Sequence, residues 1–140
     1  MVMKALKIKA IVERGADGLY SVYSEDHFGN SFLGGYGDSV EKAKTDFLES
    51  IKEAINEQQA DDKAAPNFDG ISVEYRYDIP SFFNFFDFIN VSKFAEYVGI
   101  NESKMRAYKS GVSYPGEKTT SKIFKAVKQL GKEFSVASFR

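Results

Sequence analysis

The segment Asn90–Gly111, NVSKFAEYVGINESKMRAYKSG, carries the clearest structural signals in the chain. Its first part can form a helix that ends at Val98, because Gly99 stands where the chain must turn sharply. Asn101 then offers a side-chain cap to a second helix, Glu102 to Ser110, and a glycine closes the segment. We therefore predict two short helices that cross at a tight glycine turn.

This arrangement describes a helix-turn-helix. Apolar side chains spaced along both helices are expected to hold the pair together: Phe94, Val98, Ile100, Met105 and Tyr108. The outer face of the second helix is left with small, polar and basic residues: Ser103, Lys104, Arg106, Ala107 and Lys109. A basic outer face on the second helix is typical of a recognition helix.

Those outer residues have the chemistry that duplex DNA requires. Arg106 can form paired hydrogen bonds to a guanine edge, and Ser103 can adapt to several bases. Lys104 and Lys109 suit phosphates as point charges, and amides at the two helix starts can also meet a phosphate. The predicted DNA-binding residues are Ser92, Asn101, Ser103, Lys104, Arg106 and Lys109. The alternative is an ordinary helical hairpin with a solvated basic face.

The same region resembles a known family. Residues 94–127, FAEYVGINESKMRAYKSGVSYPGEKTTSKIFKAV, resemble the Xre/Cro-type helix-turn-helix. The matching features are Phe94-Ala95, Gly99-Ile100, Ser110-Gly111, Pro115 and a final helix from Thr119 to Leu130. One departure is Lys109, which stands where the family usually has an acidic residue, so contacts at that position are expected to differ.

An aromatic helix is expected just before this motif. Pro80 can begin it, since proline is tolerated in a first turn. Its apolar residues cover nearly the whole surface: Phe82, Phe83, Phe85, Phe86, Phe88 and Ile89. We expect it to be buried on more than one side. A surface for stacking bases is the alternative, which the absence of basic residues from Ser81 to Asn90 disfavours.

The N-terminal half reads as three strands, a helix and a fourth strand. Period-2 alternation predicts strands at Lys4–Glu13 and Leu19–Ser24, joined by a Gly-Ala-Asp-Gly turn, and a short strand at Ser31–Gly35. Asp38 or Ser39 can cap a helix, whose apolar positions are Val40, Ala43, Phe47, Ile51, Ala54 and Ile55. Residues 58–67 read as a linker, and alternation predicts a further strand within Phe68–Tyr77.

These elements resemble the N-terminal domain of HicB antitoxins. The resemblance begins at ERGADGLYSVY, Glu13–Tyr23, and continues through Phe28-Gly29 and the Gly37-Asp38-Ser39 turn into the helix with Glu41 and Ala43. It implies a β-β-β-α fold like a partial double-stranded-RNA-binding domain. It also implies a partner, a small HicA-like ribonuclease toxin, which this domain would neutralise. The loop His27–Asn30 departs from the Pro-Gly-Cys-like segment usual in the family.

The charge is divided between the halves. Residues 1–78 hold nine Lys+Arg and fifteen Asp+Glu, a net charge of −6, whereas residues 79–140 hold ten and five, a net charge of +5. A basic module suits phosphate backbone, and an acidic one argues against RNA binding by the N-terminal domain. The alternative is that small domains often differ by a few charges.

The C-terminal segment Glu133–Phe139, EFSVASF, alternates over its length and predicts a terminal strand. A lone strand needs a partner. Pairing with the same strand of a second subunit would give a homodimer or a higher even oligomer, as helix-turn-helix proteins use to read two half-sites. Pairing with the first domain's sheet is the alternative, and the sequence does not separate the two.

Several classes of function are disfavoured. The chain has no cysteine, and its only histidine, His27, lies in a polar loop, so we expect no metal site and no cofactor. Gly34–Gly37 lacks the order of a phosphate loop and reads as a turn, and Asp61-Asp62 reads as a solvating pair. No nucleophile, base and orienting group assemble, so no enzyme is expected. With no signal h-region and no membrane-length apolar stretch, we expect a cytoplasmic protein.

Together these features predict an α+β protein of two domains. Residues 1–78 form a HicB-like β-β-β-α(-β) domain, and residues 79–140 form an all-α helix-turn-helix domain with a C-terminal strand. The expected function is that of an antitoxin that represses its own operon. The alternative is an orphan helix-turn-helix regulator whose N-terminal domain serves dimerisation or ligand sensing.

Overall fold

An antiparallel hairpin of β1 (Leu6–Arg14) and β2 (Tyr20–Ser24) begins the computed structural model, which describes residues 6–26, 32–61 and 68–140. Gly18 has a φ of 82° in the connecting turn, a conformation that glycine adopts without a steric penalty. The backbone N–H of Gly15 donates to Leu19 O at 2.7 Å and closes the turn. The predicted hairpin is confirmed.

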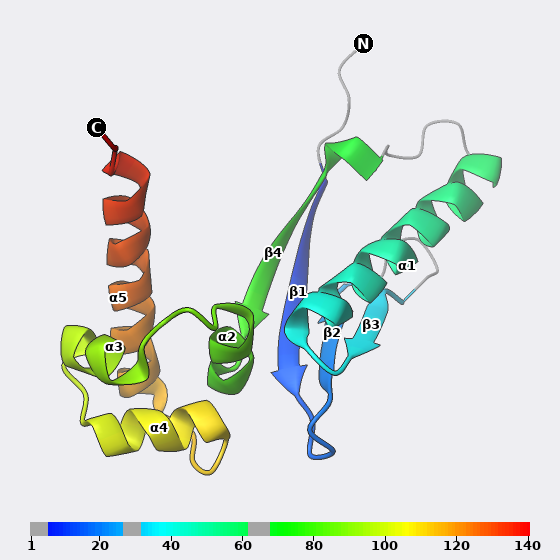
Figure 1. Cartoon of the computed structure of the whole chain (residues 1–140). Coiled ribbons are helices and arrows are strands. Elements are labelled where there is room, and N and C mark those ends of the chain that lie inside the picture. Colours follow the sequence, from blue (N-terminus) through cyan, green and yellow to red (C-terminus); the bar gives the residue numbers. More distant parts are fainter. Residues whose placement is uncertain (1–5, 27–31, 62–67) are drawn as a thin grey trace. The chain divides into compact units, whose positions relative to one another are not determined.

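Two more strands complete a four-stranded mixed sheet of order β3-β2-β1-β4 (Figure 1). β3 (Gly34–Gly37) pairs antiparallel with β2, and β4 (Ile71–Tyr77) pairs parallel with β1, with Leu6 opposite Ile71. A 3₁₀ turn, η1 (Phe68–Gly70), precedes β4, and the fourth strand predicted within Phe68–Tyr77 is confirmed.

The third strand lies further along the chain than predicted. The prediction placed it at Ser31–Gly35 and treated Gly34–Gly37 as a turn, whereas these four residues are the strand itself. A Cβ on Gly35 would overlap the backbone nitrogen of Phe47 and lie 2.6 Å from Ala43 O. The helix backbone therefore rests directly on β3, and glycine is needed for this close approach rather than for a turn.

The long helix α1 (Val40–Asp61) covers one face of the sheet and runs into the predicted linker. Residues 58–61 are helical, so the prediction that the linker begins at residue 58 is wrong, and residues 62–67 lie outside the described residues. Glutamine and alanine in this last turn are good helix formers, which explains why the helix outlasts its apolar stripe. The apolar positions predicted for α1 are all buried.

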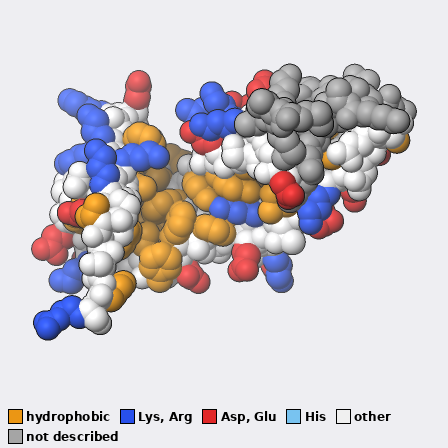
Figure 2. Space-filling model, turned by 90° about the horizontal axis from the view of Figure 1, so that it is seen from above, with side chains coloured by type: hydrophobic (Ala, Val, Ile, Leu, Met, Phe, Trp, Pro, Cys, Tyr) orange, Lys and Arg blue, Asp and Glu red, His pale blue; other side chains and the backbone are white. Residues whose placement is uncertain are grey.

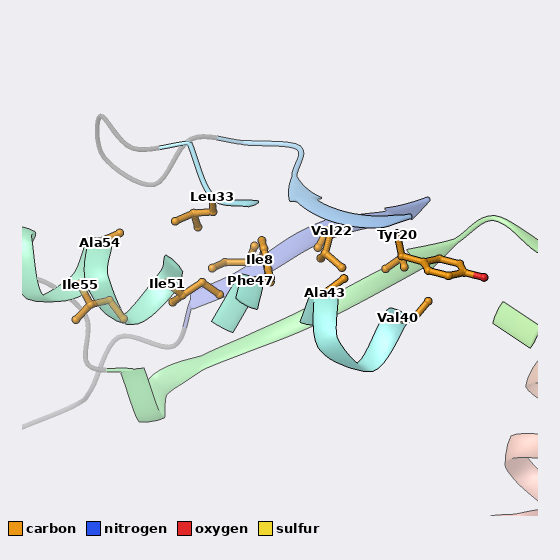
Figure 3. Close-up of a cluster of buried hydrophobic side chains, with 12 residues drawn as sticks. Ile8, Tyr20, Val22, Leu33, Val40, Ala43, Phe47, Ile51, Ala54 and Ile55 are labelled. Atoms are coloured by element: carbon orange, nitrogen blue, oxygen red, sulfur yellow. The ribbon is translucent and has the colours of Figure 1, made fainter. Parts of the chain in front are cut away.

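The core of the first unit lies between α1 and the sheet (Figure 3). One row of side chains comes from α1: Val40, Ala43, Phe47, Ile51, Ala54 and Ile55. The facing row comes from the strands and the segment before β3: Ile8, Ala10, Val12, Tyr20, Val22 and Leu33. The other sheet face is polar and exposed, which explains the period-2 alternation of β1 and β4.

The half-buried amine of Lys44 connects α1 with β4 and with the helix that follows β4. Lys44 Nζ lies over the rings of Tyr75, Tyr77 and Phe85, at 4.1, 4.8 and 3.3 Å from their centroids. It also donates a hydrogen bond to the Tyr77 hydroxyl. Burial lowers the pKa of Lys44 to about 8.

Helix α2 (Ile79–Phe85) belongs to the first unit. Asp78 Oδ1 accepts from Ser81 N at 2.9 Å and caps α2, while Asn84 Oδ1 accepts from Val40 N at 2.9 Å and so satisfies an amide in the first turn of α1. The chain divides into units of residues 1–86 and 87–140, eight residues beyond the predicted boundary. The helix begins at Ile79, one residue before the predicted Pro80, and ends at Phe85, and Phe88 is 76% exposed.

The second unit consists of α3 (Val91–Val98), α4 (Glu102–Ser110) and α5 (Glu117–Val136). Met105 is fully buried at its centre. The other buried apolar side chains of this unit are Val91, Phe94, Ala95, Val98 and Ile123. The helices and the turn of the predicted motif are confirmed, and Ile100 and Tyr108 are half-buried.

The predicted C-terminal strand is wrong. The final helix, predicted for Thr119–Leu130, continues to Val136, and residues 137–140 have no regular structure. The alternation of Phe134, Val136 and Ser138 spans too few residues to exclude a helix, and Phe134 also continues the helical spacing of Val127 and Leu130. No described helix is both long and apolar enough to cross a bilayer.

Candidate nucleic-acid interface

The turn between α3 and α4 is fixed by its backbone. Gly99 ends α3 in the left-handed conformation, with φ 84° and ψ 38°. Its N–H donates to Glu96 O at 3.2 Å, and Ile100 N–H donates to Ala95 O at 2.9 Å. These two bonds form a Schellman motif, which satisfies carbonyls at the end of α3 and redirects the chain into α4.

Both ends of α4 are also capped. Asn101 Oδ1 accepts from Lys104 N at 3.2 Å at its start. Gly111 ends the helix with φ 78°, and Val112 N donates to Ala107 O at 3.0 Å in a second Schellman motif. Lys122 Nζ of α5 donates to Gly99 O at 2.9 Å and ties the turn to the third helix. The position of α4 within the second unit is thus set by capping as well as by burial of Met105.

The face of α4 away from Met105 presents Ser103, Lys104 and Arg106 to solvent, whereas Lys109, four residues after Met105, is exposed at the flank of that face. Ala107 is half-buried, so it contributes less to this face than predicted. Asn101 is exposed at the helix start, with its side-chain oxygen committed to the cap. Five of the six predicted residues therefore lie on α4 or at its first turn.

Arg106 forms an ion pair within α4. Its Nη2 and Nε lie 2.8 and 3.2 Å from the same carboxylate oxygen, Oε1 of Glu102, one helical turn earlier. Both side chains remain more than half exposed. An exposed ion pair contributes about 0.2–1 kcal/mol, so Arg106 is held extended along the helix without being locked there.

The sixth predicted residue, Ser92, lies on the other helix of the motif. Its hydroxyl donates to Asn90 Oδ1 at 2.9 Å, and the same oxygen accepts from Lys93 N at 2.9 Å. Asn90 rather than Ser92 is therefore the cap of α3. Ser92 reinforces that cap and is half-buried, which leaves it less available to a phosphate than the residues of α4.

A row of lysines on α5 was missing from the sequence-based set. Lys118, Lys122 and Lys125 line a shallow depression together with Glu117 and Ser121. Their spacing of four and three residues places them on one helical face, opposite the apolar side chains of α5. That spacing is visible in the sequence and would have identified them. Figure 2 shows blue Lys and Arg side chains projecting from the second unit, on the left as in Figure 1.

The first unit has the opposite electrostatic character. Residues 1–86 carry the same net charge of −6 as residues 1–78, because residues 79–86 contain no charged side chain. On the outer sheet face, ion pairs join Lys7 to Glu74 at 3.8 Å and Arg76 to Glu25 at 3.4 Å. Among the described residues, no group of His, Asp and Glu side chains is arranged to hold a metal ion.

Comparison of the chain with protein-family models, with curated proteins and with solved structures found no match.

Proposed function

We propose that this chain is a DNA-binding transcription regulator of the antitoxin type, whose second unit binds duplex DNA upstream of its own gene. The observation that carries the proposal is the geometry of α4. A doubly capped helix follows a Schellman turn and exposes Ser103, Lys104 and Arg106 on one face, with Lys109 exposed at the flank of that face. The net charge of +5 on residues 87–140 supports an approach to the phosphate backbone.

Arg106 is the residue we assign to direct base recognition. To reach a guanine, its guanidinium exchanges Glu102 for the O6 and N7 acceptors of the base. A bidentate contact to guanine is worth about 1–3 kcal/mol of discrimination, more than the about 0.2–1 kcal/mol of an exposed ion pair. The exchange is therefore favourable on the correct sequence and unfavourable on most others.

We assign the first unit to the binding of a small ribonuclease toxin. A ribonuclease that holds RNA must present a basic surface, and the net charge of −6 on this unit complements such a surface. The same charge disfavours RNA as a direct ligand of the first unit. Co-purification of this chain with the product of an adjacent small gene tests this part of the proposal.

An alternative function is a regulator whose first unit serves dimerisation or ligand sensing. The sheet edge favours it, because β3 is an edge strand that can pair with another chain and its Tyr36 is 71% exposed. The two functions differ in one respect. An antitoxin inactivates a toxin encoded by the adjacent gene, whereas the alternative regulator does not.

The DNA proposal is tested by fluorescence anisotropy of the full chain on its own upstream DNA and on a scrambled duplex, at two salt concentrations. We expect tighter binding to the upstream DNA and weakening on both duplexes as salt rises. Arg106→Ala should reduce the ratio of the two affinities by about 5- to 150-fold, the equivalent of one lost bidentate contact.

Two charge-removing variants serve as controls. Lys104→Ala should weaken binding to both duplexes by similar factors and lower the salt slope by about one, as expected for a phosphate contact. Lys132→Ala removes the same charge from the C-terminal half of α5 and should change either affinity little. If the affinity ratio survives Arg106→Ala, the assignment of α4 as the recognition helix is wrong.

A further inference from the structure

One side of α5 carries a seam formed by Phe124, Val127, Gly131 and Phe134, of which Val127 is half-buried and the other three residues are exposed. Their spacing of three, four and three residues is that of the a and d positions of a coiled coil. Phe124 and Phe134 are 59% and 69% exposed. All residues from 131 to the C-terminus are exposed, and Figure 1 shows this end of α5 extending past α3.

The seam is distinct from the side of α5 that packs inside the second unit. Ile123 is buried, and Tyr97 of α3 donates its hydroxyl to Glu133 Oε2 at 3.3 Å. On a helical projection, the side of α5 that faces α3 extends from Glu133 to Ile123. The seam lies on the neighbouring side, next to Ile123. The lysines 118, 122, 125 and 132 project on the opposite side, so the seam itself holds no charged residue.

Gly131 is unexplained by the contacts of its own chain. Glycine is the least favourable helix residue apart from proline, and Gly131 lies well inside α5. It has no positive φ, and a Cβ built on it meets no atom of the described structure within 4 Å. A glycine on an apolar helix face allows another helix backbone to approach closely. The absent side chain therefore points to a partner from outside the unit.

We propose that the seam binds the same seam of a second copy of this chain in an antiparallel pair. A twofold axis level with Gln129 places Val127 against the partner's Gly131 and Phe124 against the partner's Phe134. Each isopropyl group then fills the space that the partner's glycine leaves, and the rings meet at both ends of the seam. The surface is self-complementary, as a twofold interface requires.

The helix dipoles fit the antiparallel direction, because they oppose each other when the two helices run in opposite directions. Lys128 flanks the axis, but its Nζ lies over its own Phe124 ring at 5.2 Å, and its flexible stem allows the charge to remain in water.

The size of the seam sets the expected strength of association. Pairing buries the exposed parts of four aromatic rings, roughly 500 Å² if a buried aromatic side chain covers about 200 Å². Stable complexes bury about 1,200 Å² or more. We therefore expect a weak dimer with a dissociation constant in the micromolar range, which would strengthen when two copies bind neighbouring half-sites on DNA.

Sedimentation equilibrium of the full chain from about 5 to 200 μM tests the proposal. We expect reversible dimerisation that Gly131→Leu weakens at least tenfold, because the added side chain occupies the place of the partner's Val127. Gly131→Ala should raise the thermal midpoint of the second unit and still weaken association severalfold, a combination that an isolated helix would not show. Lys132→Ala, one residue away on the opposite side, should leave association unchanged.

Disulfide trapping tests the direction of the pair, since the chain has no cysteine of its own. A mixture of Val127→Cys and Gly131→Cys proteins should form a mixed disulfide faster than either protein forms one with itself. A wild-type chain that stays monomeric at 200 μM overturns the proposal. So does a dimer that Gly131→Leu does not weaken, or a Val127→Cys protein that links fastest to itself.

Discussion

Lys44 is the residue whose chemistry departs most from that of an exposed side chain. Its amine lies among the rings of Tyr75, Tyr77 and Phe85, and burial lowers its pKa to about 8. The ring faces and the Tyr77 hydroxyl attract the ammonium and partly offset the desolvation. Burial raises the pKa of both tyrosines, that of Tyr77 to about 12.

These shifts predict a pH dependence of stability. Between pH 8 and 10.5 the unfolded chain binds a proton at Lys44 that the folded chain has released, so the free energy of unfolding rises with pH in this window. After allowance for solvent and the ring contacts, we expect a gain of about 1 kcal/mol from pH 7.5 to 9.5. Urea denaturation followed by circular dichroism measures it.

Lys44→Met provides the control, because methionine retains the length and the apolar contacts without a titrating amine. The gain between pH 7.5 and 9.5 should disappear in this variant. A wild-type protein whose stability does not rise with pH over this range would show that the amine remains protonated in the folded state.

At the scale of elements, the contact of α1 with β3 requires glycine at Gly35 and Gly37, and Gly35 makes the closer approach. A Cβ at Gly35 would overlap the backbone of α1, whereas a Cβ at Gly34 would come no closer than 3.6 Å to any described atom. We expect Gly35→Ala to lower the free energy of unfolding of the first unit by more than 2 kcal/mol, because the helix must shift on its sheet. Gly34→Ala is the matched control.

Thermal denaturation of the two alanine variants should separate them by several degrees. Near-equal midpoints would mean that α1 is free to move away from β3. The comparison tests the packing itself, since both substitutions add the same methyl group to neighbouring residues of one strand.

The elements that were predictable from sequence are those set by local signals. Gly99 and Asn101 define a turn and a cap from a few neighbouring residues, and the structure places both as predicted. β3 was misplaced because Gly34 and Gly35 carry no side chain to alternate, and their strand is set by contact with α1. The final helix is predictable to Leu130, but its last turns resemble a strand because Phe134 and Val136 alone fit both periods.

In the candidate site too, only the features set by local spacing were predictable from the sequence. The exposed residues of α4 followed from helical spacing, but the ion pair of Arg106 with Glu102 and the half-burial of Ser92 depend on side-chain geometry. The placement of α2 could not be predicted locally, since the bond from Val40 N to Asn84 joins residues far apart in the sequence. Long-range pairing, including the parallel register of β1 and β4, leaves little trace in a single sequence.

At the scale of the whole molecule, the two units have separate cores. The cluster between α1 and the sheet contains no residue beyond Phe85, and the second unit is organised around Met105, which is fully buried. Removing the Met105 side chain leaves a cavity in one core and none in the other. The cost of such a large-to-small change is about 2–5 kcal/mol.

We therefore expect Met105→Ala to unfold residues 87–140 at a lower urea concentration while residues 6–86 retain their midpoint. Amide cross-peaks in a nuclear magnetic resonance titration report the two units separately. Gly35→Ala should produce the reverse pattern and leave DNA binding by the second unit intact. If the two unfolding midpoints move together in both variants, the units unfold cooperatively. The first unit can then influence DNA binding through folding alone. Independent midpoints require any such influence to act through a bound partner.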